Sequence, residues 1–442
     1  MTQLGEGLER LRGRLCDGDV TVGVVGLGYV GLPMALLCAG KVAQVVGIDV
    51  SSSRVEDLQR GESYVDDISN EELGGAVESG HFRATTDYGA VRSCDVLMVC
   101  VPTPLRKTGE PDVSYIVDSV DSIREHMGPG KLIILESTTY PGTTEELVKP
   151  RLERDGLRAG REFCLAFSPE RIDPGPAYAD WGTHNVPKVV GGVTEKCTEI
   201  ATHFYGLVVE TVVPVSSSSV AEMVKLLENT YRGVNIAMVN ELALMCNELD
   251  VDVWEVVDAA KTKPYGFQAF YPGPGLGGHC IPIDPFYLAW KARLHGFEPR
   301  FIDLAGRINA NMPRYVVQRV ADMLNEEGKA LNGSRVRVLG VAYKRDVSDV
   351  RESPAITIIE ALRRKGAEVS FSDPHVRSIS LTDGSELSRT ELDPGGLTDC
   401  DCALIVTGHS RFQWDLVVEH APLVLDTRNA LKAFDADHIR KL

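Results

Sequence analysis

The sequence predicts an α/β protein built in three segments, and three observations carry this prediction. Residues 20 to about 210 alternate short apolar, β-branched runs with helix-like stretches, which indicates βαβ units around a parallel sheet. From residue 214 a helical periodicity continues for roughly thirty residues. From about residue 332 the strand–helix alternation returns. We therefore expect an N-terminal domain over residues 1–213, a helical central domain over 214–331 and a C-terminal domain over 332–442.

Length, charge and composition narrow the class of protein. At 442 residues the chain is too long for one core, and its 43% hydrophobic and 25% charged content is typical of globular proteins. The net charge of −17 disfavours non-specific binding to nucleic acid or to anionic membranes. The charged start MTQLGEGLERLRGRL does not resemble a signal peptide, and no apolar run approaches the ~20 residues of a membrane span. We expect a cytoplasmic protein.

The first segment is expected to form a Rossmann domain that binds a dinucleotide. Its strand candidates are VTVGVVGLG, VAQVVGIDV, CDVLMVCVP, KLIILEST and FCLAFSP. The first of these runs into Gly26-x-Gly28-x-x-Gly31, and Asp49 ends the second strand 18 residues after Gly31. A glycine turn alone would not need this strand, helix and acid together. Because Asp49 should bind ribose hydroxyls and repel a 2′-phosphate, the pattern favours NAD over NADP, although Arg54 nearby weakens this preference.

The helical segment begins with a predicted capping box formed by Ser219 and Glu222. Lys225, Asn229 and Arg232 then share one face of this helix. The three side chains form either a solvated polar stripe or part of a functional site, and the pattern leaves both readings open. A second helix over VWEVVDAAK leads to the loop FYPGPGLGGHCIPIDPFYL.

Two further polar clusters lie where α/β sheets usually bind ligands. Glu170 and Arg171 in FSPERIDPG follow a strand directly, and they form either a ligand site or a surface ion pair. Lys344, Arg345 and Arg351 surround a strand-to-helix turn in GVAYKRDVSDVRESP. Their charges could hold the phosphates of a nucleotide.

The ten cysteines form no CxxC pair and no Cys/His cluster with zinc spacing, so we predict neither a metal site nor a disulfide framework. Several, such as Cys100 in VLMVCVP, lie in strand-like runs and should be buried and inert. Cys280 differs because it lies in a loop rich in glycine and proline, with Asp284 four residues later. A structural cysteine needs only an apolar wall, whereas a reactive one needs a fixed position and room for a substrate.

Seven motifs in order give the chain a resemblance to a known family. They are GLGYVGLP, VPTP, STTYPGTT, FSPERIDPG, AEMVKLLENTYR, PGPGLGGHCIPIDPFYL and AYKRDVSDVRESP. Over nearly its whole length the chain resembles the UDP-glucose/GDP-mannose dehydrogenases. The resemblance implies an NAD-binding domain, a helical middle, a Rossmann-like nucleotide-sugar-binding domain and a homodimer formed through the central helices. It also implies two successive oxidations of a sugar C6 alcohol to a carboxylate, with two NAD consumed.

The resemblance also implies residue roles. Cys280 would add to the intermediate aldehyde to form a thiohemiacetal and then a thioester, while Lys225 and Asn229 stabilise the oxyanion. Asp284 and Glu170 would orient or activate water, and Thr138 would lie near the reacting carbon. The implied cofactor contacts are Gly26, Gly28, Tyr29, Val30, Gly31, Asp49, Arg54, Thr103, Thr138 and Arg351. The implied substrate contacts are Glu170, Arg171, Lys225, Asn229, Tyr271, Gly277 and Lys344.

The motifs SPERIDPG and TKPYGF are most similar to UDP-N-acetylglucosamine 6-dehydrogenases. The alternatives are UDP-N-acetylmannosamine enzymes, which tend to differ at Asp173, and UDP-glucose enzymes, whose Lys and Arg around the cysteine are absent here. A single-step 3-hydroxyacid or phosphogluconate dehydrogenase would share the first two segments, but would need neither Cys280 nor residues 332–442.

Overall fold

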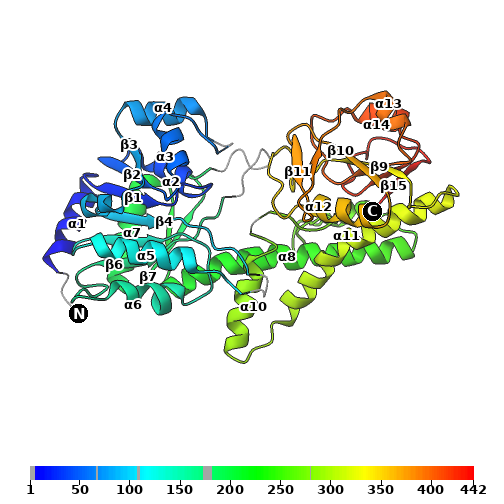
Figure 1. Ribbon diagram of the computed structural model, residues 1–442. Coiled ribbons are helices and arrows are strands. Elements are labelled where there is room, and N and C mark those ends of the chain that lie inside the picture. Colours follow the sequence, from blue (N-terminus) through cyan, green and yellow to red (C-terminus); the bar gives the residue numbers. More distant parts are fainter. Residues whose placement is uncertain (1–4, 66–67, 107–109, 173–181, 279) are drawn as a thin grey trace. The chain divides into compact units, whose positions relative to one another are not determined.

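The computed structural model describes residues 5–65, 68–106, 110–172, 182–278 and 280–442 (Figure 1). It divides into two compact units. The first contains Met1–Glu228 and Phe286–Gly296, and the second contains Asn229–Pro285 and Phe297–Leu442. The α/β class is confirmed, because each unit is built around its own sheet.

An eight-stranded sheet forms the centre of the first unit, in the order β3-β2-β1-β4-β5-β6-β7-β8. The strands are β1 Thr21–Val25, β2 Gln44–Ile48, β3 Phe82–Thr85, β4 Val96–Val99, β5 Leu132–Leu135, β6 Cys164–Phe167, β7 Lys188–Gly192 and β8 Val212–Pro214. The first six strands have the doubly wound order of a Rossmann fold. The sheet departs from the expected parallel arrangement at one pair, because β7 runs antiparallel to β6.

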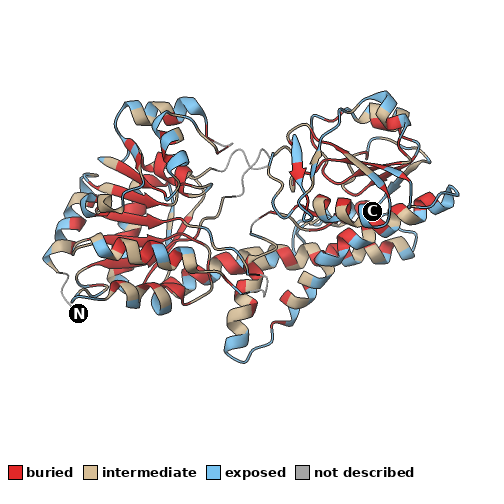
Figure 2. Ribbon diagram, viewed as in Figure 1, coloured by how far each residue is buried: buried red, intermediate tan, exposed pale blue. Residues whose placement is uncertain are grey.

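Helices cover both faces of this sheet. They are α1 Glu6–Cys16, α2 Gly31–Cys38, α3 Ser52–Gln59, α4 Asn70–Glu78, α5 Ser114–His126, α6 Lys149–Leu152 and α7 Glu195–Val208, with short turns η1 Tyr88–Ser93 and η2 Thr144–Val148. In β5, Leu132 and Ile134 pack in the cluster that includes α1, α2 and α7, whereas Ile133 and Leu135 pack with α5. Both faces of the strand are therefore apolar, and Figure 2 shows the strands as the most buried part of the unit.

The long helix α8 (Ser218–Glu248) does not begin as the sequence predicted. The hydroxyl of Ser217 accepts the N–H of Val220 at 3.3 Å, so the capping residue lies two positions before Ser219. Glu222 is fully buried and accepts hydrogen bonds from Gly142 and Thr144 instead of closing the helix end. The predicted capping box is wrong because a tertiary contact takes the glutamate.

A wholly parallel five-stranded sheet, β10-β9-β13-β14-β15, forms the centre of the second unit. Its strands are β9 Arg335–Leu339, β10 Glu368–Ser372, β13 Cys402–Ile405, β14 Val424–Asp426 and β15 Ile439–Lys441, and β11 Ser378–Ser380 pairs with β12 Glu386–Ser388. The helices are α9 Val253–Lys261, α11 Arg300–Glu326, α12 Pro354–Arg364, α13 Pro394–Thr398 and α14 Trp414–His420, and α10 (Asp284–Leu294) begins here. Helices α11 and α12 pack against the apolar core of this sheet.

Two buried amides join α8, α11 and the cysteine loop in the second unit. Asn240 donates its Nδ2 hydrogen to Asn309 Oδ1 at 2.9 Å, and Asn309 donates to the carbonyl of Gly233 at 3.1 Å. Asn240 Oδ1 accepts the N–H of Gly273 at 2.9 Å. Since a buried amide is costly unless it is hydrogen-bonded, this network fixes the start of the loop that carries Cys280.

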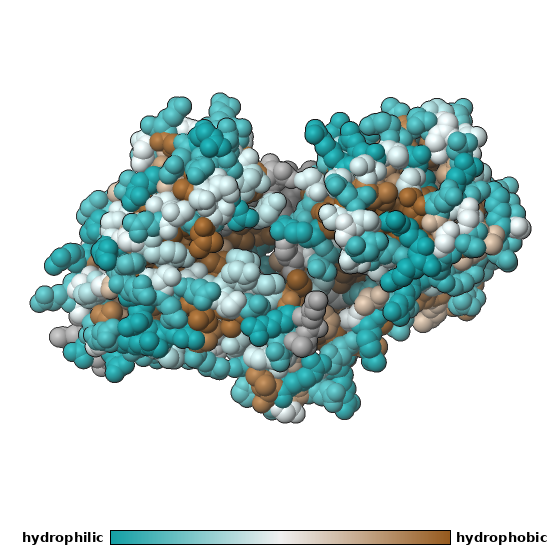
Figure 3. Space-filling model, in the orientation of Figure 1, coloured by the Kyte–Doolittle hydropathy of each residue, from teal (hydrophilic) through white to brown (hydrophobic). Residues whose placement is uncertain are grey.

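The visible surface is mainly hydrophilic, with scattered hydrophobic patches (Figure 3). This agrees with the acidic composition. Among the described residues, no helix is both long enough and apolar enough to cross a membrane.

Candidate active site

The glycine turn after β1 leaves space for a ligand at one position only. Gly26 has a φ of +88°, and a Cβ there would lie 2.7 Å from the carbonyl oxygen of Cys100. A Cβ on Gly31 would lie 1.8 Å from the carbonyl oxygen of Gly26. A Cβ on Gly28 would meet no atom within 4 Å. Chain packing thus requires glycine at 26 and 31, whereas at Gly28 the open space fits the close approach of a pyrophosphate.

Asp49 lies at the end of β2, as the sequence predicted. Its Oδ2 accepts the N–H of Leu27 and its Oδ1 accepts that of Ser51, both at 2.9 Å. The side chain of Arg54 is about half exposed and reaches within 3.9 Å of Asp49 Oδ2. Each carboxylate oxygen keeps acceptor capacity for a ribose hydroxyl, so the geometry fits NAD.

Four further residues predicted to contact the cofactor lie in loops of the first unit. Tyr29 is 53% exposed, and Val30 directly precedes α2. The hydroxyl of Thr103, after β4, donates to the carbonyl of Thr138, after β5, at 2.6 Å. This bond holds two neighbouring loops together at the carboxyl edge of the sheet.

Glu170 lies in a buried network of charges that the sequence did not predict. Its Oε1 accepts the N–H groups of Arg171 and Ile172, and its Oε2 lies 3.2 Å from Lys188 Nζ. Lys188 Nζ also lies 3.3 Å from Glu136 Oε2, and the hydroxyl of Tyr205 donates to Glu136 Oε1. These side chains come from β7, the ends of β5 and β6, and α7, so no local pattern reveals them.

This network sets the ionisation of its members. Burial opposes ionisation of Glu170, but Lys188, the backbone N–H of Ile172 and Lys225 hold the pKa of Glu170 below its usual value. Burial raises the pKa of Glu136, although Lys188 opposes this shift. Burial would lower the pKa of Lys188, but the two carboxylates raise it instead. Glu170 is therefore held as a carboxylate in a half-buried position.

The surface ion pair between Glu170 and Arg171, which was the alternative to a ligand site, does not form. The guanidinium of Arg171 instead pairs with Glu228 at 2.6 Å and donates to the carbonyl of Pro187 at 2.7 Å. Arg171 thus joins α8 to the start of β7 within the first unit.

The face of α8 that carries Lys225, Asn229 and Arg232 is not a solvated stripe. Lys225 is only 8% exposed, and Asn229 and Arg232 are half-buried. The interpretation of these three residues as a solvated polar stripe is therefore wrong. A buried lysine in electrostatic reach of Glu170 is compatible with a functional role.

The cysteine loop lies in the second unit. The carbonyl of Cys280 accepts the N–H groups of Ile283 at 3.0 Å and Asp284 at 2.8 Å, which forms the turn that starts α10. Asp284 is 3% exposed and its Oδ2 accepts a hydrogen bond from Asn229 Nδ2 at 2.5 Å. Asn229 and Asp284, the two residues of the second unit predicted to act with Cys280, are thus in direct contact.

Cys280 differs in exposure from most other cysteines. None of the ten forms a disulfide, and only Cys16 and Cys280 are exposed. Cys100 is buried, and burial raises its pKa well above the usual value, as expected for an inert thiol. The prediction that this cysteine is structural is consistent with that environment, and Cys280 remains the accessible thiol in a loop.

The glycines before Cys280 pack on the loop that carries Lys344 and Arg351. A Cβ on Gly277 would lie 2.7 Å from the Cβ of Tyr343, and Gly278 donates its N–H to the carbonyl of Arg351 at 3.1 Å. Packing against Tyr343 therefore explains the glycine at 277 without a substrate contact. The two loops form one rigid arrangement within the second unit.

The second unit contains three further residues that were predicted to bind the substrate or the cofactor. Tyr271 donates its hydroxyl to Asp258 at 2.6 Å, and its ring stacks on Trp254. Arg351 pairs with Asp349 through two nitrogens, at 2.9 Å and 2.6 Å, and its side chain is 41% exposed. Lys344 is half-buried.

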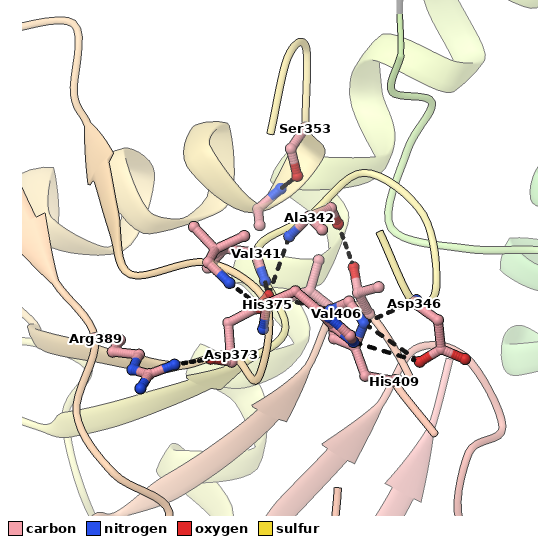
Figure 4. Close-up of polar contacts among 12 residues, drawn as sticks. Val341, Ala342, Asp346, Ser353, Asp373, His375, Arg389, Val406 and His409 are labelled. Carbon is pink, nitrogen blue, oxygen red and sulfur yellow. Dashed lines mark hydrogen bonds and ion pairs between the residues drawn. The ribbon is translucent and has the colours of Figure 1, made fainter. Parts of the chain in front are cut away.

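Folding also assembles a cluster that cysteine and histidine spacing did not predict. Asp346, His375 and His409 come from three loops of the second unit, and their possible ligand atoms all lie within 4.8 Å of one another (Figure 4). Because the three residues are far apart in sequence, the absence of a zinc-spaced motif could not exclude such a site.

Comparisons with known proteins agree with this arrangement. Models of the UDP-glucose/GDP-mannose dehydrogenase family match as NAD binding domain over residues 20–209, central domain over 219–311 and UDP binding domain over 337–433. A UDP-N-acetyl-D-glucosamine 6-dehydrogenase of Pseudomonas aeruginosa is 36% identical over 397 residues, which cover 89% of this chain and 92% of that protein. A UDP-N-acetyl-D-mannosamine dehydrogenase of Methanococcus maripaludis is 34% identical over 422 residues, covering 92% of each.

A solved structure is similar over nearly the whole chain. The UDP-D-ManNAc dehydrogenase of Pyrococcus horikoshii superimposes with a TM-score of 0.86 at 31% identity, covering 95% of this chain and 98% of that one. Sequence and fold therefore agree along the same length. This chain belongs to the UDP-glucose/GDP-mannose dehydrogenase family and is an NAD-dependent nucleotide-sugar dehydrogenase.

Proposed function

We propose that this enzyme oxidises the C6 alcohol of a UDP-linked sugar to a carboxylate in two steps, through a covalent adduct on Cys280. The observation that carries the proposal is an exposed thiol in a loop fixed on both sides. Its glycines pack on Tyr343, and its carbonyl starts α10 at Asp284. A fixed, accessible thiol is what nucleophilic catalysis requires.

The two oxidations need different chemistry. NAD, held by the glycine turn after β1 and by Asp49, would supply the hydride acceptor for both oxidations. The first converts the alcohol to an aldehyde, with the hydroxyl proton passing to a base. The Cys280 thiolate then adds to the aldehyde carbon, and the thiohemiacetal loses the second hydride to give a thioester. Water breaks the C–S bond, which releases the carboxylate and restores the thiolate. One sugar therefore consumes two NAD and one water.

The polar residues supply the charges that these steps need. We assign Lys225 and Asn229 to the oxyanion that develops at C6. Glu170, held ionised by Lys188, and Asp284, held by Asn229, orient or activate the water, and Thr138 lies near the reacting carbon.

The binding residues divide between the two ligands. We assign the cofactor to Gly26, Gly28, Tyr29, Val30, Gly31, Asp49, Arg54, Thr103, Thr138 and Arg351. We assign the substrate to Glu170, Arg171, Lys225, Asn229, Tyr271, Gly277 and Lys344. Arg171 and Tyr271 are already held by Glu228 and Asp258, so they offer pre-positioned groups.

We propose UDP-N-acetylglucosamine as the substrate, because SPERIDPG and TKPYGF are most similar to enzymes of that specificity. The N-acetylmannosamine epimer is the second candidate, since relatives with that name are similar over the same length. Asp173, which should separate the two, lies outside the described residues.

A panel of UDP-glucose, UDP-N-acetylglucosamine, UDP-N-acetylmannosamine and GDP-mannose tests this function. The expected result is two NADH per molecule of UDP-N-acetylglucosamine and a uronic acid product. One NADH per sugar, with an aldehyde as the final product, would contradict the two-step mechanism. Two NADH from the mannosamine epimer alone would retain the mechanism and change the substrate.

We also propose a homodimer of this enzyme in the cytoplasm. On α8 in the second unit, the exposed apolar side chains Tyr231, Met238 and Met245 recur every seven residues, followed by Leu249. Such a row on one helix face fits a second copy of the chain. Met238→Lys together with Met245→Lys should yield a monomer by sedimentation velocity.

We place domain boundaries at 213/214 and 331/332, and each family match falls within one of these segments.

A further inference from the structure

Three loops at the carboxyl edge of the second sheet bring two histidines and an aspartate together. Asp346 follows β9, His375 follows β10 and His409 follows β13. Strands β10 and β13 lie on opposite sides of β9, so this edge is the switch point of the sheet. In α/β sheets this is where ligands bind. Figure 4 shows the three side chains directed toward one another.

The distances among these groups suit a small cation. His375 Nε2 and His409 Nδ1 each lie 3.8 Å from Asp346 Oδ1. With bonds of about 2.1 Å, ligand atoms around a tetrahedral zinc ion lie roughly 3.4 Å apart. Small side-chain movements would therefore place all three atoms at bonding distance. This separation is too long for a direct hydrogen bond between the Asp346 carboxylate and either ring, and Asp346 Oδ1 instead accepts the N–H of Ser410 at 2.7 Å.

His409 already has the tautomer that metal binding needs. The backbone N–H of Asp346 donates to His409 Nδ1 at 2.9 Å, which places a lone pair on this nitrogen. The proton is then on Nε2, which lies 3.1 Å from Asp373 Oδ2. Metal-bound histidines usually donate their second nitrogen to a carboxylate in this way. His409 is completely buried, so its ring orientation is fixed.

Asp373 is in turn held rigidly. Its Oδ2 accepts the N–H of Val341 at 2.7 Å, and its Oδ1 accepts the N–H groups of His375 at 2.8 Å and Val376 at 3.0 Å. The outer carboxylate therefore orients the ring of His409 and the backbone of His375 together. Metal-binding histidines are usually positioned by a carboxylate that is itself held by hydrogen bonds, as Asp373 is here.

The imidazole ring of His375 has one nitrogen, Nε2, whose environment suggests a ligand. His375 Nε2 is buried and has no hydrogen-bond partner among the described residues. Buried polar atoms are rarely left without a hydrogen-bond partner, and a bound ion is one of the usual reasons when they are. Its ring centroid lies 4.9 Å from that of His409, so both nitrogens face the same small volume beside Asp346.

We propose that Asp346, His375 and His409 bind a divalent transition-metal ion, Zn²⁺ by the chemistry of the donors. Two imidazoles and one carboxylate suit zinc, and the fourth position is left for water or a ligand oxygen. Binding replaces the hydrogen bond from Asp346 N–H to His409 Nδ1 with a metal bond. The ion would join the loops after β9, β10 and β13, and the first of these also carries Lys344 and Arg351.

The test uses the full-length protein carrying Cys16→Ala and Cys280→Ala, so that neither exposed thiol can bind the metal. After removal of metals with a chelator, Zn²⁺ is titrated by calorimetry, and Co²⁺ is followed by its visible spectrum. One Zn²⁺ per chain and a tetrahedral Co²⁺ spectrum without thiolate bands are expected. Thermal unfolding should shift to higher temperature with Zn²⁺, because the ion binds the folded state.

His375→Gln and Asp346→Asn should each weaken Zn²⁺ binding by at least about 100-fold, and Asp373→Asn by roughly 10- to 100-fold. His420→Gln is the matched control, since His420 lies on α14 away from this cluster, and it should bind as the parent does. His375→Gln removes no hydrogen bond of Nε2, so it should fold without metal. Absence of binding in the parent, or equal binding in His375→Gln and His420→Gln, would overturn the proposal and leave a simple Asp346–His375 ion pair.

Discussion

Lys188 lies 3.2 Å from the carboxylate of Glu170, and this buried contact favours the ionised form of a residue that we propose to orient or activate water. Lys188 is 5% exposed and has Glu136 as its second partner at 3.3 Å. Removing the ammonium leaves two buried carboxylates without a counter-charge. Lys188→Met should therefore lower the free energy of unfolding by about 3–5 kcal/mol, as measured by urea denaturation at pH 7.

The pH dependence of this variant gives a second readout. The pKa of Glu170 is lowered on folding, so its contribution to stability is present above its unfolded pKa and is lost as pH falls through the folded pKa. In Lys188→Met both carboxylates are easier to protonate, so the loss of stability should shrink below about pH 5. Lys432→Met, at an exposed lysine, should change stability by less than about 0.5 kcal/mol. An equal effect of both variants would contradict the buried-pair account.

Glu222 gives an opposite pH dependence. Burial raises its pKa to about 7, although the hydrogen bonds from Thr144 and Gly142 oppose the shift. A carboxyl with a raised folded pKa binds more protons in the folded state, so the stability it confers falls as pH rises from its unfolded pKa of ~4.5 to 7. The loss is up to about 3 kcal/mol. Glu222→Gln should remove this slope, so its stability relative to wild type should improve between pH 5 and pH 8.

Glu241→Gln is the matched control for this measurement, because Glu241 is an exposed glutamate on the same helix, α8. It should leave the pH dependence unchanged. If Glu222→Gln keeps the wild-type slope, the titrating group is not Glu222.

The difference between Glu222 and Ser219 illustrates what the sequence could not predict. The S-x-x-E pattern is a local signal, and it placed the start of α8 within two residues. Which partner the glutamate takes depends on the loop at Gly142 and Thr144, which comes from a distant part of the chain. A tertiary contact between buried groups outweighed the local cap.

The Rossmann strands and the glycine turn were predictable because their signals are local. The strands are short apolar, β-branched runs, and the structure explains the need for glycine at Gly26 and Gly31 by the lack of space for a Cβ atom. Lys188 and His409 were not predictable in this way. Each meets its partners only when several strands end at one edge of a sheet. A single sequence does not show which residues these strand ends bring into contact.

We expect the cofactor preference to depend on Asp49. Since its carboxylate would repel a 2′-phosphate, kcat/KM with NAD should greatly exceed that with NADP. Asp49→Ala should narrow this ratio by at least about tenfold, which corresponds to ~1.4 kcal/mol. Arg54→Ala, which removes a positive charge 3.9 Å from Asp49, should widen the ratio instead. Equal use of both cofactors by the wild type would contradict the assignment.

Lys344 should bind a phosphate group of the nucleotide. Loss of one charge-assisted hydrogen bond costs about 1.5–3 kcal/mol, so Lys344→Met should weaken UDP binding by roughly ten- to hundredfold in calorimetry. Lys365→Met is the control, because Lys365 is an exposed lysine at the end of α12 in the same unit. The same affinity in both variants would place Lys344 outside the nucleotide site.

The Cys280 variants test the covalent step directly. If the thiol acts only in the second oxidation, Cys280→Ala should release at most one NADH per sugar and form no adduct. Cys280→Ser retains a nucleophilic oxygen, which is far less ionised than a thiol near neutral pH. We expect an ester that hydrolyses slowly, seen by mass spectrometry as a sugar-nucleotide adduct on the peptide GPGLGGHCIPIDPFYL, or a stalled aldehyde.

Cys16→Ala provides the matched control, since Cys16 and Cys280 are the two exposed cysteines of the chain. Cys16 is the last residue of α1, outside any proposed site, so its removal should leave two NADH per sugar at the wild-type rate. A packing role for Cys280 makes a different prediction: both Cys280 variants would turn over slowly with two NADH per sugar and no adduct. Because an aldehyde cannot release a second hydride until a nucleophile has added to it, uronic acid formed by Cys280→Ala would show that another group or water does this work. That result would exclude the thioester mechanism while leaving the NAD site and the fold unchanged.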